Sequence, residues 1–192
     1  MLFLTEPNIK YQSSFLAGLR EFHQEGRMLQ YNWQVVSSDF ESFLYHLRAQ
    51  QDPAKLLPYR IPQSHFWLVN DSEFIGILSL CSGPDDTFIR ISGHIGYQIR
   101  PSQRQRGYGK QLLRLGLQKA KELGLTRLLL TCDEANIASK KIIESNGGQF
   151  ETAIQVEGSP VKKLRYWIDL DQSKHFPQTG SEILLSPREK PN

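Results

Sequence analysis

The chain has 192 residues, 39% of them hydrophobic, and a net charge of +3, so it can bury one substantial core and a single domain is expected. No run approaches the roughly 18 apolar residues of a membrane span. The first residues also lack the charged-then-apolar order of a signal peptide, so we expect a cytoplasmic protein without a membrane partner.

The N-terminal third is predicted to hold one short strand and two helices. Residues 2–4 have the pattern of an edge strand, and the apolar spacing after them indicates a helix that ends near Phe22. A second helix is predicted from the N-cap pair at 38–39 to about Gln50. Residues 51–63 contain three prolines, so we expect an extended loop there instead of a regular helix or a central strand.

Three strands are predicted in the middle of the chain. Apolar runs at 65–70 and 73–81 are joined by a short polar turn, and a longer strand follows from about 88 to 99. Gly93 and Gly96 lie within this third strand and suit a β-bulge, where the ladder to a neighbouring strand is interrupted. We therefore expect a sheet that is disturbed near this point.

The second half alternates helices and strands. A strongly amphipathic helix is predicted over about 107–123, followed by a strand at 126–132 that is apolar enough to be buried on both faces. A helix is then expected at 136–146. Two last strands, at about 149–157 and 161–170, are separated by a turn so short that they must form a hairpin.

The remaining features set the domain limits and argue against two kinds of site. We expect one domain over residues 1–172 and a flexible or loosely docked tail over 173–192, where polar residues, proline and glycine dominate. Cys81 and Cys132 lie in separate apolar runs, which favours buried, reduced thiols over a disulfide or a metal pair. No metal site is proposed, and a monomer and a homodimer both stay open.

The most informative segment is Arg-Gln-Arg-Gly-Tyr-Gly-Lys at 104–110, between a predicted strand and a predicted helix. Its two glycines let backbone N–H groups approach an anion, and the helix that follows points the positive end of its dipole at the same place. Three cations, Arg104, Arg106 and Lys110, add charge of the right sign. Neither the Walker A pattern nor the dinucleotide fingerprint is present, because no Gly-Lys-Ser/Thr follows and Leu112 takes the third glycine position. The segment predicts a phosphate-binding loop for another ligand.

The cations around this loop allow a second interpretation, a nucleic-acid surface. They are Arg100, Arg104, Arg106, Lys110, Arg114, Lys119 and Lys121. However, the chain contains no recognisable nucleic-acid module, and the cations after Lys110 fall on the polar side of a helix, where charge usually just faces solvent. No nucleic-acid partner is expected.

Arg104-x-x-Gly107-x-Gly109 resembles the R/Q-x-x-G-x-G/A motif of the GNAT superfamily of N-acetyltransferases. The strand before it and the strand after its helix occur in the family's order. Asn136-Ile137-Ala138-Ser139, followed by Gly147, also resembles the family's N-x-x-S…G segment. The resemblance covers roughly residues 1–170 and is closest to a little-characterised bacterial branch of predicted acetyltransferases. It implies the α/β GNAT fold, a mixed central sheet of about seven strands that splays between the fourth and fifth strands and is flanked by about four helices.

The resemblance also implies acetyl transfer from acetyl-CoA, the cosubstrate, to a primary amine of a small molecule or peptide. The amine would attack directly in a ternary complex, and catalysis would be largely positional. Pantetheine is expected to bind the backbone of Tyr97, Gln98 and Ile99 like an added strand. The pyrophosphate-binding loop is expected to comprise Arg104, Gln105, Arg106, Gly107, Tyr108, Gly109 and Lys110. Asn136 and Ser139 match cofactor-contacting residues of the family, although Asn136 is equally suited to be a helix N-cap with Ser139 at N3.

The residues for proton transfer are less well defined by the sequence. His94 is the best candidate for the general base, with a structural strand histidine as the alternative. Asp133 and Glu134 are the next candidates, as base or as a site for the amine's charge, and they could equally complement a helix dipole. Ile143 stands where many members carry a tyrosine that protonates the departing thiolate, so the general-acid step lacks that residue. The alternative function is therefore an acyl-CoA-binding regulatory module with weak or no catalysis.

Overall fold

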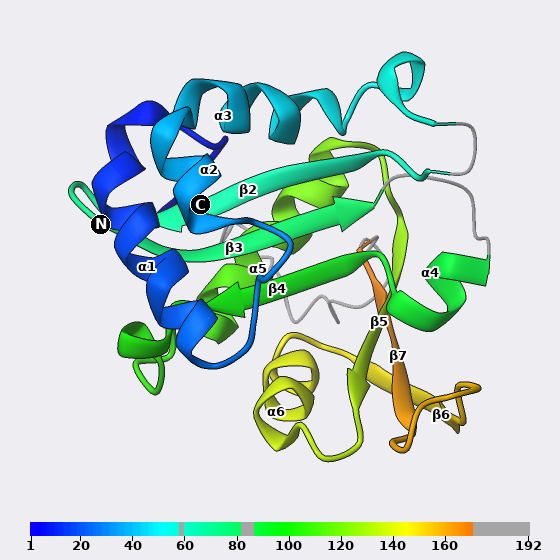
Figure 1. The fold of residues 1–192 in the computed structure, drawn as a ribbon. Coiled ribbons are helices and arrows are strands. Elements are labelled where there is room, and N and C mark those ends of the chain that lie inside the picture. The colour runs from blue at the N-terminus through cyan, green and yellow to red at the C-terminus, as the bar shows by residue number, and fades with distance from the viewer. Residues whose placement is uncertain (58–59, 82–86, 171–192) are drawn as a thin grey trace, which may run out of the picture.

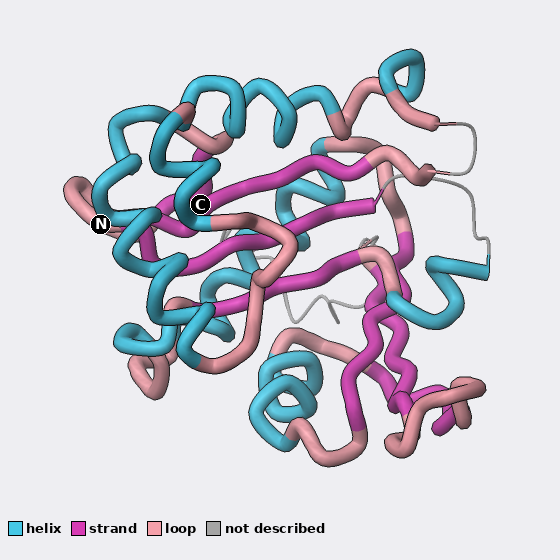
Figure 2. The backbone as a smooth tube through the Cα atoms, in the orientation of Figure 1, coloured by secondary structure: helices cyan, strands magenta, loops and turns pink. Residues whose placement is uncertain are grey.

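A computed structural model describes residues 1–57, 60–81 and 87–170 of the protein (Figures 1 and 2). Its strands and α-helices are, in chain order, β1 (Phe3–Thr5), α1 (Gln12–Gln24), α2 (Trp33–Ser38), α3 (Phe40–Ala49), β2 (Gln63–Val69), β3 (Phe74–Cys81), α4 (Thr87–Ser92), β4 (Ile95–Ile99), α5 (Tyr108–Glu122), β5 (Arg127–Asp133), α6 (Ile137–Ser145), β6 (Gln149–Ile154) and β7 (Lys163–Asp169). Among these helices, none has the length and apolar character needed to cross a membrane.

The strands form two antiparallel sheets. The first has the order β1-β2-β3-β4, and the second has the order β5-β7-β6. In the first sheet Leu78 of β3 lies opposite Tyr97 of β4, and in the second Leu130 of β5 lies opposite Tyr166 of β7. The expected single mixed sheet is therefore divided in two over the described residues, and the division falls between the fourth and fifth strands, where the splay was predicted.

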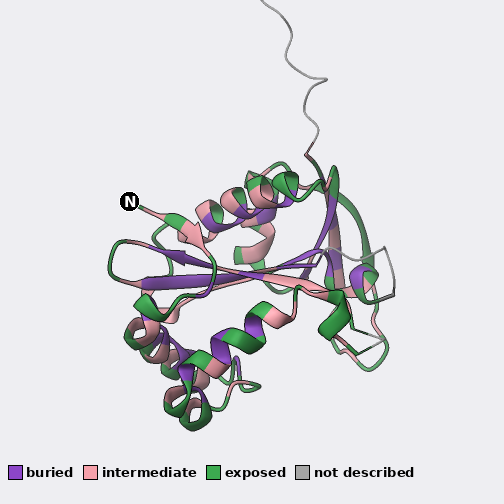
Figure 3. Cartoon of the chain, turned by 90° about the horizontal axis from the view of Figure 1, so that it is seen from above, coloured by how far each residue is buried: buried purple, intermediate pink, exposed green. Residues whose placement is uncertain are grey.

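Helices cover both faces of the first sheet (Figures 1 and 3). On one face α1, α2 and α3 enclose an aromatic core, in which the Phe15 ring stacks on Trp67 with centroids 4.6 Å apart. On the other face α5 packs through four buried positions at helical spacing: Leu112, Leu113, Gly116 and Ala120. The missing side chain of Gly116 matters because a Cβ there would overlap the Leu78 side chain of β3. This close packing holds α5 against β3, and α5 begins at the predicted phosphate-binding loop.

The predicted strand over 88–99 is wrong in its first half. Residues 87–92 form α4, and β4 occupies only Ile95–Ile99. The break lies at Gly93, whose φ of +76° is left-handed. A Cβ added at this position would lie only 2.9 Å from the carbonyl oxygen of Leu129, so glycine is the residue that fits here. The backbone turns here against β5, a contact that the local alternation of apolar residues could not predict.

A further difference is α2, which occupies part of the connector expected between the first two helices. Its N-cap is Asn32, whose side chain accepts a hydrogen bond from the N–H of Val35 at 3.1 Å. The next helix begins as predicted, with the Asp39 side chain accepting from the N–H of Ser42 at 2.9 Å. The expectation of a tail at 173–192 lies outside the described residues.

Candidate active site

The two sheets meet at one point and then separate. The N–H of His94 donates to the Leu129 carbonyl at 2.7 Å, and the N–H of Leu129 donates to His94 Nδ1 at 3.0 Å. Beyond this junction β4 pairs with β3 and β5 pairs with β7, so the strands diverge (Figure 1). Within the described residues, the edge of β4 that faces β5 has no neighbouring strand. Such an edge can bind an extended ligand through its backbone.

The loop after β4 leads to a helix start without a side-chain cap. Gly107 is the N-cap of α5 in a left-handed conformation, with φ 78° and ψ −1°. The first N–H groups of a helix have no partner within the helix, and here no cap side chain takes their place. Arg106 and Lys110 are exposed and form no ion pair with another described residue. This end of α5 can therefore attract and bind an anion.

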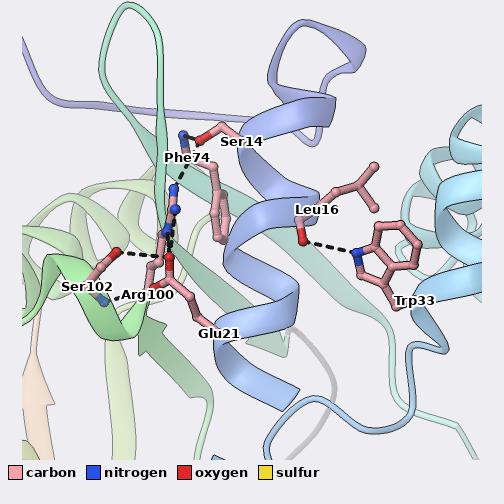
Figure 4. A network of polar contacts seen from close by, with 7 residues as sticks. All are labelled: Ser14, Leu16, Glu21, Trp33, Phe74, Arg100 and Ser102. Carbon is pink, nitrogen blue, oxygen red and sulfur yellow. Dashed lines mark hydrogen bonds and ion pairs between the residues drawn. The ribbon is translucent and has the colours of Figure 1, made fainter. Parts of the chain in front are cut away.

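The loop is tied to α1 by two carboxylates. Figure 4 shows the first, Glu21, which accepts from Arg100 Nε at 2.7 Å and from the N–H and Oγ of Ser102 at 2.9 and 3.1 Å. Burial by itself would raise the pKa of Glu21, but the hydrogen bonds from Arg100 and Ser102 outweigh it and lower that pKa. The second is Glu25, bound by both terminal nitrogens of Arg104 at 2.8 and 2.7 Å.

This pairing changes the role expected for Arg104. Its Nε donates to the carbonyl of Ile99 at 3.1 Å while its other nitrogens hold Glu25. Arg104 thus fixes the position of the loop relative to α1 and β4, and in this conformation its charge is compensated by Glu25. Glu25 lies 79 residues away in sequence, so the motif itself gave no sign of this contact.

The glycines of the loop have separate roles. Gly107 supplies the left-handed turn, and a Cβ added to it would meet nothing within 4 Å. A Cβ added to Gly109 would instead come within 2.6 Å of the Ile142 side chain, so Gly109 allows α5 and α6 to approach. Tyr108 between them is half-buried and packs against the apolar core, while Gln105 has a positive φ of 62°.

The start of α6 lies across the splay from β4. The Asn136 side chain accepts from the N–H of Ser139 at 3.0 Å, which is the capping role expected for it. The Ser139 hydroxyl also forms a 2.8 Å hydrogen bond with the Tyr97 hydroxyl of β4, and burial raises the pKa of Tyr97 to about 12. Ile143 is fully buried in the core. Tyr97 and Ser139 thus place two hydroxyl groups on this side of the site, and both are neutral near pH 7.

The three candidates for proton transfer are not brought together. His94 is buried, and its Nδ1 lone pair accepts the Leu129 N–H at the junction of the sheets. Asp133 lies at the other end of β5, four residues or roughly 13 Å from Leu129, and its carboxylate pairs with Lys163 at 2.7 Å. Glu134 is exposed, and its N–H donates to the carbonyl of Lys162 at 2.9 Å. The catalytic roles of these residues stay predictions.

A pocket on the α1 side of β4 was not predicted from the sequence. Its volume is about 290 Å³, and its lining includes Met28, Tyr31, Ser79, Gly96 and Gln98. Gly96 leaves the space above β4 open, since a Cβ there would meet no atom within 4 Å. The Gln98 Oε1 atom is buried without a hydrogen-bond partner among the described residues. The alternation of side chains along a strand predicts that Gly96 and Gln98 share a face of β4. No local sequence pattern predicts that Ser79 and Met28 line the same pocket.

The site thus combines two splayed strands, an uncapped helix start and a pocket beside β4, and a family comparison agrees with this arrangement. Residues 16–149 match the model of the Acetyltransferase (GNAT) domain. The chain belongs to the GNAT family of acetyltransferases. The GNAT fold predicted from the sequence is thereby confirmed.

Solved GNAT structures resemble the protein over most of its length. RimJ of Mycobacterium smegmatis, in complex with CoA-disulfide, is 19% identical and has a TM-score of 0.66, with 91% of this chain and 84% of that chain covered. RimL, a ribosomal L7/L12 alpha-N-protein acetyltransferase in complex with coenzyme A, is 18% identical with a TM-score of 0.61 and coverages of 88% and 94%. The microcin C7 self-immunity acetyltransferase MccE, with acetyl-CoA and AMP, is 14% identical with a TM-score of 0.61 and coverages of 88% and 92%. A search of curated proteins found no match.

Proposed function

We propose that the protein moves an acetyl group from acetyl-CoA to a primary amine of a small molecule or peptide, by direct attack in a ternary complex. The observation that carries this proposal is a single juxtaposition. The open edge of β4 connects the uncapped start of α5, at Gly107, with the pocket of about 290 Å³ beside Gly96. One end suits a phosphate group and the other leaves room for an acceptor.

The residues present fit acetyl-CoA. The backbone N–H groups at the start of α5, together with Arg106 and Lys110, would hold the pyrophosphate. The exposed edge of β4 at Tyr97 and Gln98 would bind pantetheine, although the Ile99 carbonyl already accepts from Arg104. Asn136 and Ser139 at the start of α6 lie across the splay from β4, where Ser139 bonds to Tyr97, so they are placed to contact the same ligand.

The reaction does not depend on the tyrosine that many family members carry where this chain has Ile143. An ordinary thiol titrates near pH 8.5, so the thiolate is a tolerable leaving group at neutral pH. An amine placed in the pocket beside Gly96 would lie next to the strand that positions the thioester. Holding the two reactants in this way can supply most of the rate enhancement.

The pocket supports an amine acceptor in particular. The unpartnered Gln98 Oε1 can accept a hydrogen bond from an N–H donor, and Met28 and Tyr31 offer apolar contact to the group that carries it. RimL, a structural relative, is an alpha-N-protein acetyltransferase. A peptide α-amine is accordingly the first acceptor class to examine, followed by small amines.

The alternative, an acyl-CoA-binding regulatory module, is favoured by one observation. Ile143 is buried in the core, so no hydroxyl replaces the family's tyrosine at that position. Tight acetyl-CoA binding without turnover on any amine would support this alternative.

Two assays test the proposal. Release of free coenzyme A thiol is measured with a panel of peptides with free N-termini, amino acids, polyamines and small amines, and release with at least one of them is expected. Acetyl-CoA affinity is then measured by calorimetry for Gly107→Asp and for its matched control Gly107→Asn. Both side chains tolerate the left-handed conformation and have the same size, but only aspartate repels phosphate. We expect Gly107→Asp to bind at least tenfold more weakly than Gly107→Asn, and equal affinities would contradict the phosphate site at α5.

A further inference from the structure

We infer that Ser79, His65 and Gln50 form a proton relay that removes the proton from the attacking amine. The inference rests on the proposed function, and it assigns a general base that differs from His94, Asp133 and Glu134. Its groups come from three elements: Ser79 from β3, His65 from β2 and Gln50 from the end of α3.

The three side chains form a continuous chain of hydrogen bonds. His65 and Ser79 lie directly opposite each other in the β2–β3 ladder. His65 Nδ1 is 2.9 Å from Ser79 Oγ, and His65 Nε2 is 2.9 Å from Gln50 Oε1. His65 is buried, with 8% of its surface exposed, so its imidazole is largely protected from solvent.

The partners of the ring decide the direction of these hydrogen bonds. The Gln50 oxygen can only accept, so His65 Nε2 carries the hydrogen and Nδ1 of the neutral ring is left with a lone pair. Ser79 therefore donates its hydroxyl hydrogen to Nδ1. Burial lowers the pKa of His65 to about 4, so the ring is neutral near pH 7 and its Nδ1 lone pair is available. The same shift makes the imidazolium short-lived, so His65 holds the proton only in passing.

Ser79 is also in the right place. It lies opposite Gly96 in the β3–β4 ladder, and both residues line the pocket beside the proposed thioester position. Because Gly96 has no side chain, the hydroxyl of Ser79 is not screened from the open space above β4. His94 offers a contrast, since its Nδ1 lone pair is already occupied by the N–H of Leu129.

The relay gives a balanced reaction. The amine nitrogen uses its lone pair to form a bond to the acetyl carbonyl carbon, and the carbonyl π electrons move onto the oxygen. The nitrogen then passes one proton to Ser79 Oγ while Ser79 passes its own proton to His65 Nδ1. The carbonyl re-forms as the carbon–sulfur bond breaks, which releases the thiolate and leaves an amide. The imidazolium, held by Gln50 and Ser79, finally returns its proton through Ser79 to the thiolate or to solvent.

Charged and titratable groups near the relay enter its pH dependence. Glu6 and Arg48 line a small cavity on the other side of His65. Arg27, Tyr31 and Tyr97 line the pocket that Ser79 faces. A change in the pH profile is therefore assigned to the relay only if it appears on substitution of Ser79 or His65.

The test uses Ser79→Ala and His65→Gln, with Ser64→Ala on β2 as the matched control. The glutamine can still bond to Ser79 but cannot accept a proton. We expect both relay variants to lose about 10²-fold or more in kcat/KM, with acetyl-CoA affinity within threefold of wild type. The loss should shrink as the pH is raised from about 7 to 9, because hydroxide replaces the missing base. The control should keep wild-type activity.

The outcomes separate this inference from the proposed function. A wild-type protein that releases no thiol with any amine refutes the proposed function itself. If the wild type turns over and folded Ser79→Ala keeps more than one fifth of its kcat/KM, the relay is wrong. If Ser79→Ala is impaired but folded His65→Gln is not, the proton does not pass to His65. Circular dichroism and the acetyl-CoA titration establish that each variant is folded.

Discussion

Replacing Glu21 with alanine removes the carboxylate that joins α1 to the loop leading into α5. The change deletes hydrogen bonds from Arg100 and Ser102, and it leaves the Arg100 guanidinium without its ion-pair partner. Breaking an exposed ion pair costs about 0–1 kcal/mol, whereas breaking a buried one costs about 3–5 kcal/mol. The side chains of Arg100 and Glu21 are 13% and 23% exposed, so this pair falls between the two cases.

We therefore expect Glu21→Ala to lower the free energy of unfolding by about 2–3 kcal/mol, a value also typical of lost hydrogen bonds to charged groups. For a chain of this size it corresponds to a fall in Tm of about 4–12 °C. Urea unfolding and thermal melts measure both quantities. The control is Glu122→Ala, which breaks an exposed pair with Lys119 and should cost less than about 0.5 kcal/mol.

The effect also has a defined pH dependence. The pKa of Glu21 is lowered on folding from its ordinary value of 4.5, so its stabilisation is complete above that value and is lost as the pH falls through the lowered pKa. The difference between wild type and Glu21→Ala should therefore be constant from about pH 5 to 8 and shrink below about pH 4. A loss under about 0.5 kcal/mol at pH 7, or one that does not depend on pH in acid, would refute the role given to this contact.

Two further substitutions test the junction and the packing of the fold. His94→Ala should cost about 1–3 kcal/mol of stability by leaving the buried N–H of Leu129 without an acceptor, and it should leave the shape of the pH profile of kcat/KM unchanged. Loss of an ascending limb near neutral pH in that variant would instead support His94 as the general base. Gly116→Ala should cost about 1–3 kcal/mol in urea unfolding, because its Cβ would overlap Leu78, and an unchanged unfolding midpoint would contradict the close approach of α5 to β3.

Local chemistry was enough to predict the parts of the fold that neighbouring residues determine. The apolar spacing of α5 and the N-cap residues Asp39 and Asn136 each depend on contacts within a few residues. The antiparallel pairing of β6 with β7 was predicted as well, although the connection between Ile154 and Lys163 is longer than the short turn expected. The left-handed Gly107 at the start of α5 belongs to the same class, since glycine adopts that conformation without a Cβ penalty. These features predicted the position of a phosphate-binding loop and, through the resemblance they support, the family.

Contacts between distant segments decided the rest. The alternating apolar residues at 88–91 suit a strand as well as a short helix, and Gly93 packed against Leu129 determines where β4 begins. The charge of Arg104 is compensated by Glu25, the C-cap residue of α1, which the loop sequence does not reveal. The sequence by itself thus predicted most of the elements, although not α2 or α4, and it predicted where an anion can bind. Only the tertiary structure aligned His65 with Ser79 and opened a pocket beside Gly96, because strand register and side-chain packing join residues that no local pattern connects.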